Sequence, residues 1–141
     1  MEYCPSSLSK EREQKKLLNE SDLKKILKHI CLGLEFLHKN DIVHLDVKPG
    51  IYFNLHKIFK FHLENILISN TGKYKLADMG QAKNLSEPST DLGEGDCRYL
   101  AAEALNSSKK NLDFTKIDIF SLGMTLFELA TSKIIVCYLL I

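Results

Sequence analysis

The sequence predicts an α+β fold that is mostly helical and carries one small β hairpin. Two stretches have helical periodicity, residues 21–38 and 115–131, and a hairpin pattern lies between them at residues 66–76. At 141 residues, the chain would bury about 68% of its unfolded surface, which suffices for one hydrophobic core and not for two. We therefore expect a single domain.

The first long helix is expected from Ser21 to His38, preceded by a charged surface helix from Leu8 to Asn19. Apolar residues recur in the long helix at three- and four-residue steps, which forms one face of an amphipathic helix. Asn19, Ser21 or Asp22 can cap its start, because each side chain offers an oxygen to a free backbone N–H. The apolar positions are Leu23, Ile26, Leu27, Ile30, Cys31, Leu34 and Leu37.

The hairpin is expected from two short apolar runs, Ile66–Ile68 and Tyr74–Leu76, which are joined by the turn residues of 69–72 and lead to Asp78. Residues 81–100 are polar and contain glycine, as is typical of a surface segment. Residues 115–131 carry apolar side chains on several sides of a helix, so we expect this helix to be buried centrally.

Charge and cysteine content limit the compartment and the partners. Nineteen Lys and Arg against eighteen Asp and Glu leave a formal charge of +1, which argues against a nucleic-acid or membrane partner chosen by bulk electrostatics. The four cysteines lack metal-ligand spacing, so reduced thiols and a nuclear or cytoplasmic location are expected. The first residues do not resemble a signal peptide, and the apolar run 134–141 falls short of the ~20 residues that a membrane span needs.

Two separated pieces of sequence resemble the catalytic loop of eukaryotic protein kinases. His44 to Pro49 spell HLDVKP, and after fourteen residues Glu64 and Asn65 open the run ENILI. The hairpin, DMG, GDCRYLAAE and the DIFSLG helix follow in the order of the kinase large lobe. The resemblance implies a truncated protein-kinase-like fold, with residues 1–141 forming a partial kinase domain from the hinge to the central buried helix.

The resemblance implies a phosphotransfer site that uses ATP and Mg²⁺. Asp46 would orient the substrate hydroxyl or accept its proton, and Lys48 would lie near the transferred phosphate. Asn65 and Asp78 would hold Mg²⁺ through oxygen atoms, which are the ligands that this ion prefers.

Five further residues take structural or binding roles by resemblance. His44 is expected to pack, and Glu103 matches the Glu of the kinase APE triplet, although Ala stands where Pro is usual. Asp118 matches a buried Asp that bonds the catalytic-loop backbone; the alternative is an Asp favoured by the helix dipole at the N-terminus. Glu2 and Cys4 lie in a segment that resembles the hinge, whose backbone binds adenine.

Within the kinases, the chain resembles the Wee/Myt family. Leu45 replaces the usual Arg, Met79 replaces the Phe of DFG, and EGDCRYL precedes the AxE triplet. The resemblance implies a protein substrate, a cyclin-dependent kinase, and a cell-cycle inhibitory role. Without a cation at position 45, a phosphate-operated activation loop is not expected, so Ser86, Ser89 and Thr90 are predicted to be plain loop residues. A generic Ser/Thr kinase is the alternative, and Lys48 fits its loop pattern.

The sequence lacks the Gly-rich loop and the phosphate-binding Lys that lie upstream of the hinge in kinases; no GxGxxG occurs. Because those groups act on transition-state charge, the chain alone is expected to be inactive. The other hypotheses are a non-catalytic pseudokinase-type binding module and a translated fragment without a stable fold. Nucleotide-dependent thermal stabilisation separates the first two hypotheses from the third.

Residues 50–63 and 132–141 depart from the kinase pattern. The insertion has no acidic residue, and nine of its fourteen residues are Phe, Ile, Asn, Lys or Tyr, whose codons are AT-rich. We interpret it as an unspliced in-frame intron, and the tail as a second read-through. A genuine hydrophobic insertion that binds a partner is the alternative, and transcript reads across these codons distinguish the two.

Overall fold

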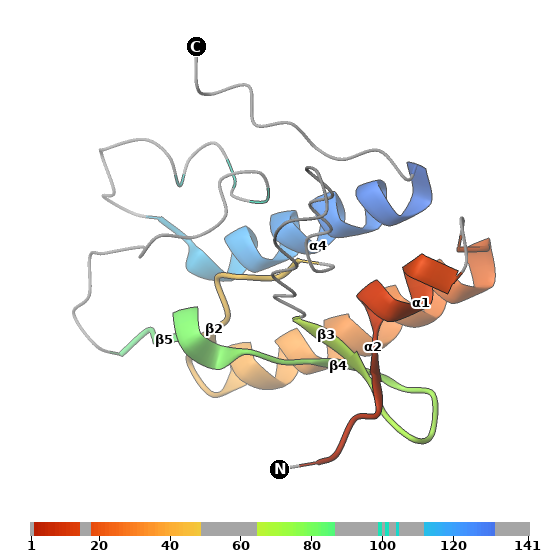
Figure 1. The fold of residues 1–141 in the computed structure, drawn as a ribbon. Helices are drawn as coiled ribbons and strands as arrows, with labels where there is room; N and C mark the ends of the chain where they lie inside the picture. The colour runs from red at the N-terminus through yellow and green to blue at the C-terminus, as the bar shows by residue number, and fades with distance from the viewer. Residues whose placement is uncertain are drawn as a thin grey trace, which may run out of the picture.

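The computed structural model describes residues 2–14, 18–48, 65–86, 99, 101, 104 and 112–131. These residues form an α+β fold in which two long helices lie beside one another and a small sheet packs against the first of them (Figure 1). In chain order the elements are β1 (Ser6–Ser7), α1 (Leu8–Gln14), α2 (Glu20–Lys39), β2 (Ile42–Val43), β3 (Ile66–Ile68), β4 (Tyr74–Leu76), the 3₁₀ helix η1 (Met79–Gln81), β5 (Lys83–Asn84) and α4 (Phe114–Thr131).

Helix α2 confirms the prediction for residues 21–38 to within one residue at each end. Its N-cap is Asn19, whose side-chain oxygen accepts a 2.9 Å hydrogen bond from the backbone N–H of Asp22. His38 and Lys39 lie in the last turn, where a positive charge interacts favourably with the helix dipole. The buried face packs into the main core through Ile26, Ile30 and Leu34.

The predicted hairpin is present as β3 and β4, which pair antiparallel with Leu67 opposite Lys75. Gly72 in its turn has φ 70°, in the left-handed region that glycine enters without strain. A third strand, β1, pairs antiparallel with β3 and was not predicted, since two serines carry no strand signal. A second small sheet pairs β2 with β5 and so ties the start of the 81–100 segment to the end of α2.

Two predictions about burial need correction. Among the described residues, the expected surface helix 8–19 is present as α1, and its first residue, Leu8, is fully buried in the core. Helix α4 is not buried on all sides among the described residues. Its inner row includes Ile117, Leu122 and Leu129, whereas its outer side exposes Ile119, Phe120 and Phe127. Apolar composition predicted burial here, but composition does not specify what covers each face.

Four predictions lie outside the residues that the structure describes: the role of Glu103, the plain-loop character of Ser89 and Thr90, the insertion 50–63 and the tail 132–141. Among the described helices, none combines the length and apolar character needed to cross a membrane.

Candidate active site

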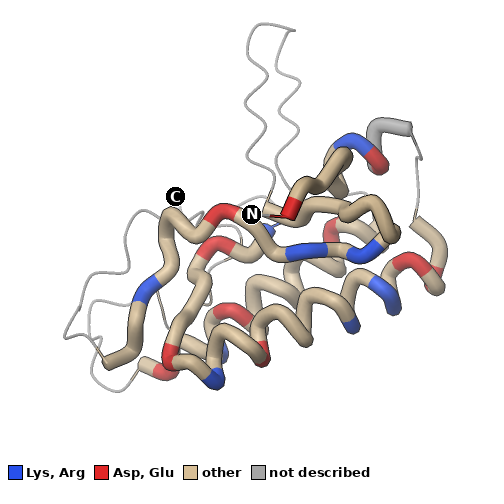
Figure 2. Tube along the Cα trace, turned by 90° about the horizontal axis from the view of Figure 1, so that it is seen from below, with Lys and Arg blue, Asp and Glu red and all other residues tan. Residues whose placement is uncertain are grey.

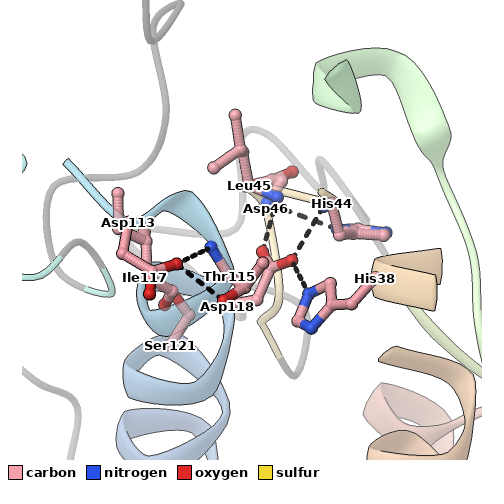
Figure 3. Close-up of polar contacts among 9 residues, drawn as sticks. All are labelled: His38, His44, Leu45, Asp46, Asp113, Thr115, Ile117, Asp118 and Ser121. Carbon is pink, nitrogen blue, oxygen red and sulfur yellow. Dashed lines mark hydrogen bonds and ion pairs between the residues drawn. The ribbon is translucent and has the colours of Figure 1, made fainter. Parts of the chain in front are cut away.

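One carboxylate on α4 binds the backbone of the loop that follows β2. Asp118 is fully buried, and its two oxygens accept hydrogen bonds from the backbone N–H groups of His44, at 2.9 Å, and Leu45, at 2.7 Å (Figure 3). Helix α4 begins at Phe114, so Asp118 lies beyond the first turn, and the helix-dipole alternative does not explain its position. A buried carboxylate needs such partners, and here the partners are the loop itself.

His38, at the C-terminal end of α2, also binds Asp118. Its Nε2 lies 2.8 Å from Asp118 Oδ2, so the carboxylate joins α2, α4 and the loop. His38 was not among the residues predicted from the sequence. The only available signal was a polar side chain in the last turn of an amphipathic helix, which is common for other reasons.

His44 links the loop to the segment that follows the hairpin. Its Nε2–H donates to the carbonyl oxygen of Ala77 at 3.0 Å, and its Nδ1 accepts from the backbone N–H of Asp46 at 3.3 Å. Complete burial lowers the pKa of His44, although the Ala77 carbonyl and the charges of Asp118, Asp46 and Asp78 act in the opposite direction. The imidazole is therefore neutral at physiological pH, and its two hydrogen bonds connect the two loops.

Asp46 and Lys48 form an ion pair at the surface end of this network. Lys48 Nζ lies 2.8 Å from each oxygen of the Asp46 carboxylate, and the two side chains are only 6% and 11% exposed. This shielding from water strengthens the attraction between the charges. The pair therefore places one carboxylate and one ammonium group together, as transfer of a phosphoryl group to a hydroxyl requires.

Asn65 completes the cluster, although nineteen sequence positions separate it from Asp46. Its Nδ2 donates two hydrogen bonds of 2.7 Å, one to the backbone carbonyl of Asp46 and one to Oδ2 of the same residue. Its side-chain oxygen, Oδ1, is buried and has no hydrogen-bond partner among the described residues. The insertion therefore does not separate these two residues in space.

Asp78 lies at the start of η1, after the hairpin. Its backbone is in the left-handed region, with φ 62°, and its Oδ1 accepts a 3.1 Å hydrogen bond from the N–H of Gly80. The residue is exposed, and its charge reaches His44. The described residues include no cluster of three or more His, Cys, Asp or Glu side chains suited to a metal. A site built from Asn65 and Asp78 would therefore supply few protein ligands, which is usual for Mg²⁺ bound together with phosphates.

Helix α4 makes two further contacts below the loop. The Thr125 hydroxyl lies 3.3 Å from the carbonyl oxygen of Val47, between the two charged loop residues. The Ser121 hydroxyl donates at 2.7 Å to the carbonyl oxygen of Tyr99, whose phenol donates to the buried carboxylate of Glu128. The same helix thus fixes both the loop and a point in the segment that follows η1.

The predicted hinge residues lie at the start of the described chain. The Glu2 carboxylate lies 3.1 Å from Lys75 Nζ on β4, and Cys4 is a half-buried free thiol just before β1. Nucleotide binding by this backbone remains a prediction.

Residues 1–138 match the protein kinase domain family, so the chain belongs to that family. Within it, the chain is similar to Wee1-like kinases. It is 37% identical over 153 residues to the Wee1-like protein kinase of Drosophila melanogaster, covering 92% of this chain and 24% of that protein. It is 40% identical over 129 residues to the Wee1-like protein kinase of Oryza sativa subsp. japonica, covering 92% and 21% respectively.

A third relative is the mitosis inhibitor protein kinase wee1 of Schizosaccharomyces pombe, at 36% identity over 125 residues, with 89% of this chain and 12% of that protein covered. The chain thus spans about a quarter or less of the length of these curated relatives. These matches confirm the Wee-like kinase resemblance and the kinase-type fold class.

Proposed function

We propose that this chain supplies the phosphotransfer half of a Wee-like protein kinase, which moves the γ-phosphate of ATP to a protein hydroxyl. The observation that carries the proposal is the assembled cluster of Asp46, Lys48 and Asn65: Lys48 binds Asp46 at 2.8 Å within the loop, and Asn65 binds Asp46 through two 2.7 Å hydrogen bonds across the insertion. Carboxylate, ammonium and amide groups in this order are the groups that transfer of a phosphoryl group to a hydroxyl uses.

Asp46 would orient the attacking hydroxyl. Its carboxylate is held by Lys48 and Asn65, and its backbone is fixed through His44 and Leu45 by Asp118. A group fixed in this way needs little reorganisation when the substrate arrives, which is the condition for efficient positioning. Lys48 is already at the carboxylate and would stabilise negative charge on the phosphate as it moves.

Asn65 and Asp78 fit a magnesium site. Two bonds from Nδ2 fix the Asn65 amide, so its buried Oδ1 is left as an oxygen without a donor among the described residues. An unpaired buried oxygen is costly, and a cation would satisfy it. Asp78 presents an exposed carboxylate in the neighbouring loop. When bound, Mg²⁺ would supply neutralisation of the phosphate oxygens of ATP.

The proposed substrate is a cyclin-dependent kinase, and the proposed consequence is inhibition of the cell cycle. Support comes from the names of the relatives, one of which is a mitosis inhibitor protein kinase. The proposed location is nuclear or cytoplasmic.

A thermal-unfolding titration of the chain tests nucleotide binding. With Mg²⁺ and ATP, a folded kinase site raises the midpoint of unfolding, because the ligand binds only the folded state. At a ligand concentration of about 100 times Kd the stabilisation is about 2.7 kcal/mol. An unchanged midpoint at millimolar ATP would count against both the kinase and the pseudokinase-type binding module. Phosphate transfer after joining the chain to a small lobe then separates the kinase from the binding module.

A further inference from the structure

A basic patch lies on the N-terminal half of α2, where the hairpin packs against the helix; Asp118 contacts the other end of α2. It consists of Lys25, Lys28 and Lys73, gathered around His29. The backbone N–H of Tyr74 donates to His29 Nδ1 at 3.3 Å, which places Lys73 directly beside this histidine. Lys25 and Lys28 lie one turn before and next to His29 on α2. Figure 2 shows the Lys positions of α2 and of the hairpin in blue on neighbouring elements.

These three lysines differ from the other lysines of the same surface. Lys24 pairs with Glu20 at 2.6 Å, Lys39 with Glu35 at 2.5 Å, and Lys75 with Glu2 at 3.1 Å. Lys25, Lys28 and Lys73 are exposed and form no ion pair with any residue that the structure describes. Of the acids near the patch, Glu11 accepts from the Tyr74 hydroxyl at 3.1 Å, and Asp22 acts on the same tyrosine through its charge. The patch therefore has a surplus of positive charge.

The positive charges of the patch also act on His29. Burial lowers the pKa of His29, and the charges of Lys73, Lys28, Lys25 and Lys75 lower it further. The imidazole is consequently neutral at physiological pH. Since Nδ1 accepts a hydrogen bond, the proton of the neutral ring is on Nε2, where it can be donated.

An apolar strip continues from the basic patch along the same side of α2. Leu32 and Phe36 follow Lys28 at successive four-residue steps, so the three side chains form one row on the helix surface. Leu32 is 54% exposed and Phe36 is 68% exposed. The row from Lys25 to Phe36 is about 16 Å long at 1.5 Å per residue. An extended peptide of about five residues covers that distance.

We propose that this row is a docking site for a segment of a partner protein. The segment is acidic, and its last residue is apolar. Its carboxylates would lie against Lys25, Lys28 and Lys73, and its apolar residue would cover Leu32 and Phe36. A protein segment fits better than a membrane, because three lysines and two apolar side chains form a narrow row, whereas a membrane surface needs a broad basic face. The proposal is independent of phosphate transfer.

The test is fluorescence anisotropy with the whole 141-residue chain and a labelled synthetic peptide, Glu-Glu-Asp-Gly-Leu-Phe. Substituting Lys25, Lys28 and Lys73 together by Gln is expected to weaken binding by about thirty-fold, from three lost charge contacts. The matched control substitutes three paired residues by Gln: Lys24, Lys39 and Lys116, the last of which pairs with Asp113 at 3.4 Å. This control removes the same net charge and is expected to change Kd less than about two-fold. Arg at the three patch positions should restore binding.

Two further comparisons distinguish specific docking from general attraction. Leu32→Ser combined with Phe36→Ser should weaken binding of the peptide that ends in Leu-Phe and leave binding of an all-acidic peptide unchanged. Equal weakening by the patch variant and its control would overturn the proposal in favour of bulk charge, and so would undetectable binding. Tighter binding to anionic phosphatidylserine vesicles than to the peptide would also overturn it. Far-UV circular dichroism checks that each variant is folded.

Discussion

Asp118 and Leu45 are seventy-three positions apart in sequence, and a 2.7 Å hydrogen bond joins the Asp118 carboxylate to the backbone N–H of Leu45. Leu45 has φ 62°, in the left-handed region that is unfavourable for a side chain of this size. The carboxylate therefore stabilises a backbone conformation that the loop would not hold alone, and this conformation presents Asp46 next to Lys48 and Asn65.

Replacing Asp118 by Ala tests how strongly α4 holds the loop. The change leaves two buried N–H groups and His38 without their acceptor, so the free energy of unfolding is expected to fall by about 3 kcal/mol. Chemical denaturation measures it. Asp113→Ala, directly before the same helix, is the control: Asp113 is exposed and accepts from the backbone N–H of Thr115 at 3.1 Å, so its loss should cost about 1 kcal/mol. Equal costs would show that Asp118 does not anchor the loop.

His44 predicts a loss of stability in weak acid. Burial lowers its pKa in the folded state below the ordinary value of 6.5, so the unfolded chain binds the proton first as the pH falls. The stability is complete above about pH 6.5 and decreases progressively below it. Denaturation at several pH values between about 5.5 and 7.5 measures this slope.

In this pH series, His44→Phe is expected to reduce the slope of the free energy of unfolding against pH. The change also removes two hydrogen bonds, which lowers the stability at every pH. His29→Gln is the matched control. The pKa of His29 is also lowered by burial, so His29 contributes with the same sign, but its side chain is only half-buried and its share should be smaller. A slope that survives His44→Phe and vanishes with His29→Gln would contradict the assignment.

Asn65 predicts the magnesium dependence of nucleotide binding. Asn65→Ala removes the unpartnered Oδ1 together with both bonds to Asp46, so the additional stabilisation by ATP on adding Mg²⁺ should be lost. Asn70→Ala, at an exposed position of the hairpin turn, is the control and should retain the additional stabilisation on adding Mg²⁺. Thermal unfolding with ATP in magnesium or in a chelator gives both values. Unchanged magnesium dependence in Asn65→Ala would remove this residue from the metal site.

Removing residues 50–63 tests whether the insertion belongs to the working protein. Deletion of these fourteen residues shortens the separation of Asp46 and Asn65 from nineteen positions to five. Because the two residues already touch, the deletion should preserve the fold and raise the free energy of unfolding by about 1 kcal/mol through the lower entropy of loop closure. A scrambled insertion of equal length should behave like the parent chain. Loss of folding after deletion, with the scrambled chain also unfolded, would instead support a genuine inserted element.

The sequence predicted the elements whose signals are local. The apolar period of Ile26, Ile30 and Leu34 predicted α2, and two short apolar runs around Gly72 predicted the hairpin. The strands β1, β2 and β5 were missed, since two-residue strands are defined by their partners and not by their own residues.

Site geometry was harder to predict than the residue types. Asp46, Lys48 and Asn65 were recognised by resemblance, but the hydrogen bonds between Asn65 and Asp46 depend on how the chain closes across the insertion. His38 was missed because its partner, Asp118, is eighty positions away. The exposed side of α4 was also missed, because an apolar pattern does not determine what packs against it.

Phosphate transfer by Asp46→Asn tests the central claim most directly. The parent is this chain joined to the small lobe of a Wee1-like relative, which supplies the Gly-rich loop and the phosphate-binding Lys. With ATP, Mg²⁺ and a cyclin-dependent kinase as substrate, transfer of the γ-phosphate is expected in the parent, and a loss of at least about a hundred-fold is expected in Asp46→Asn. Equal rates in the two proteins, or no transfer by a folded parent that binds Mg²⁺ and ATP, would contradict the account.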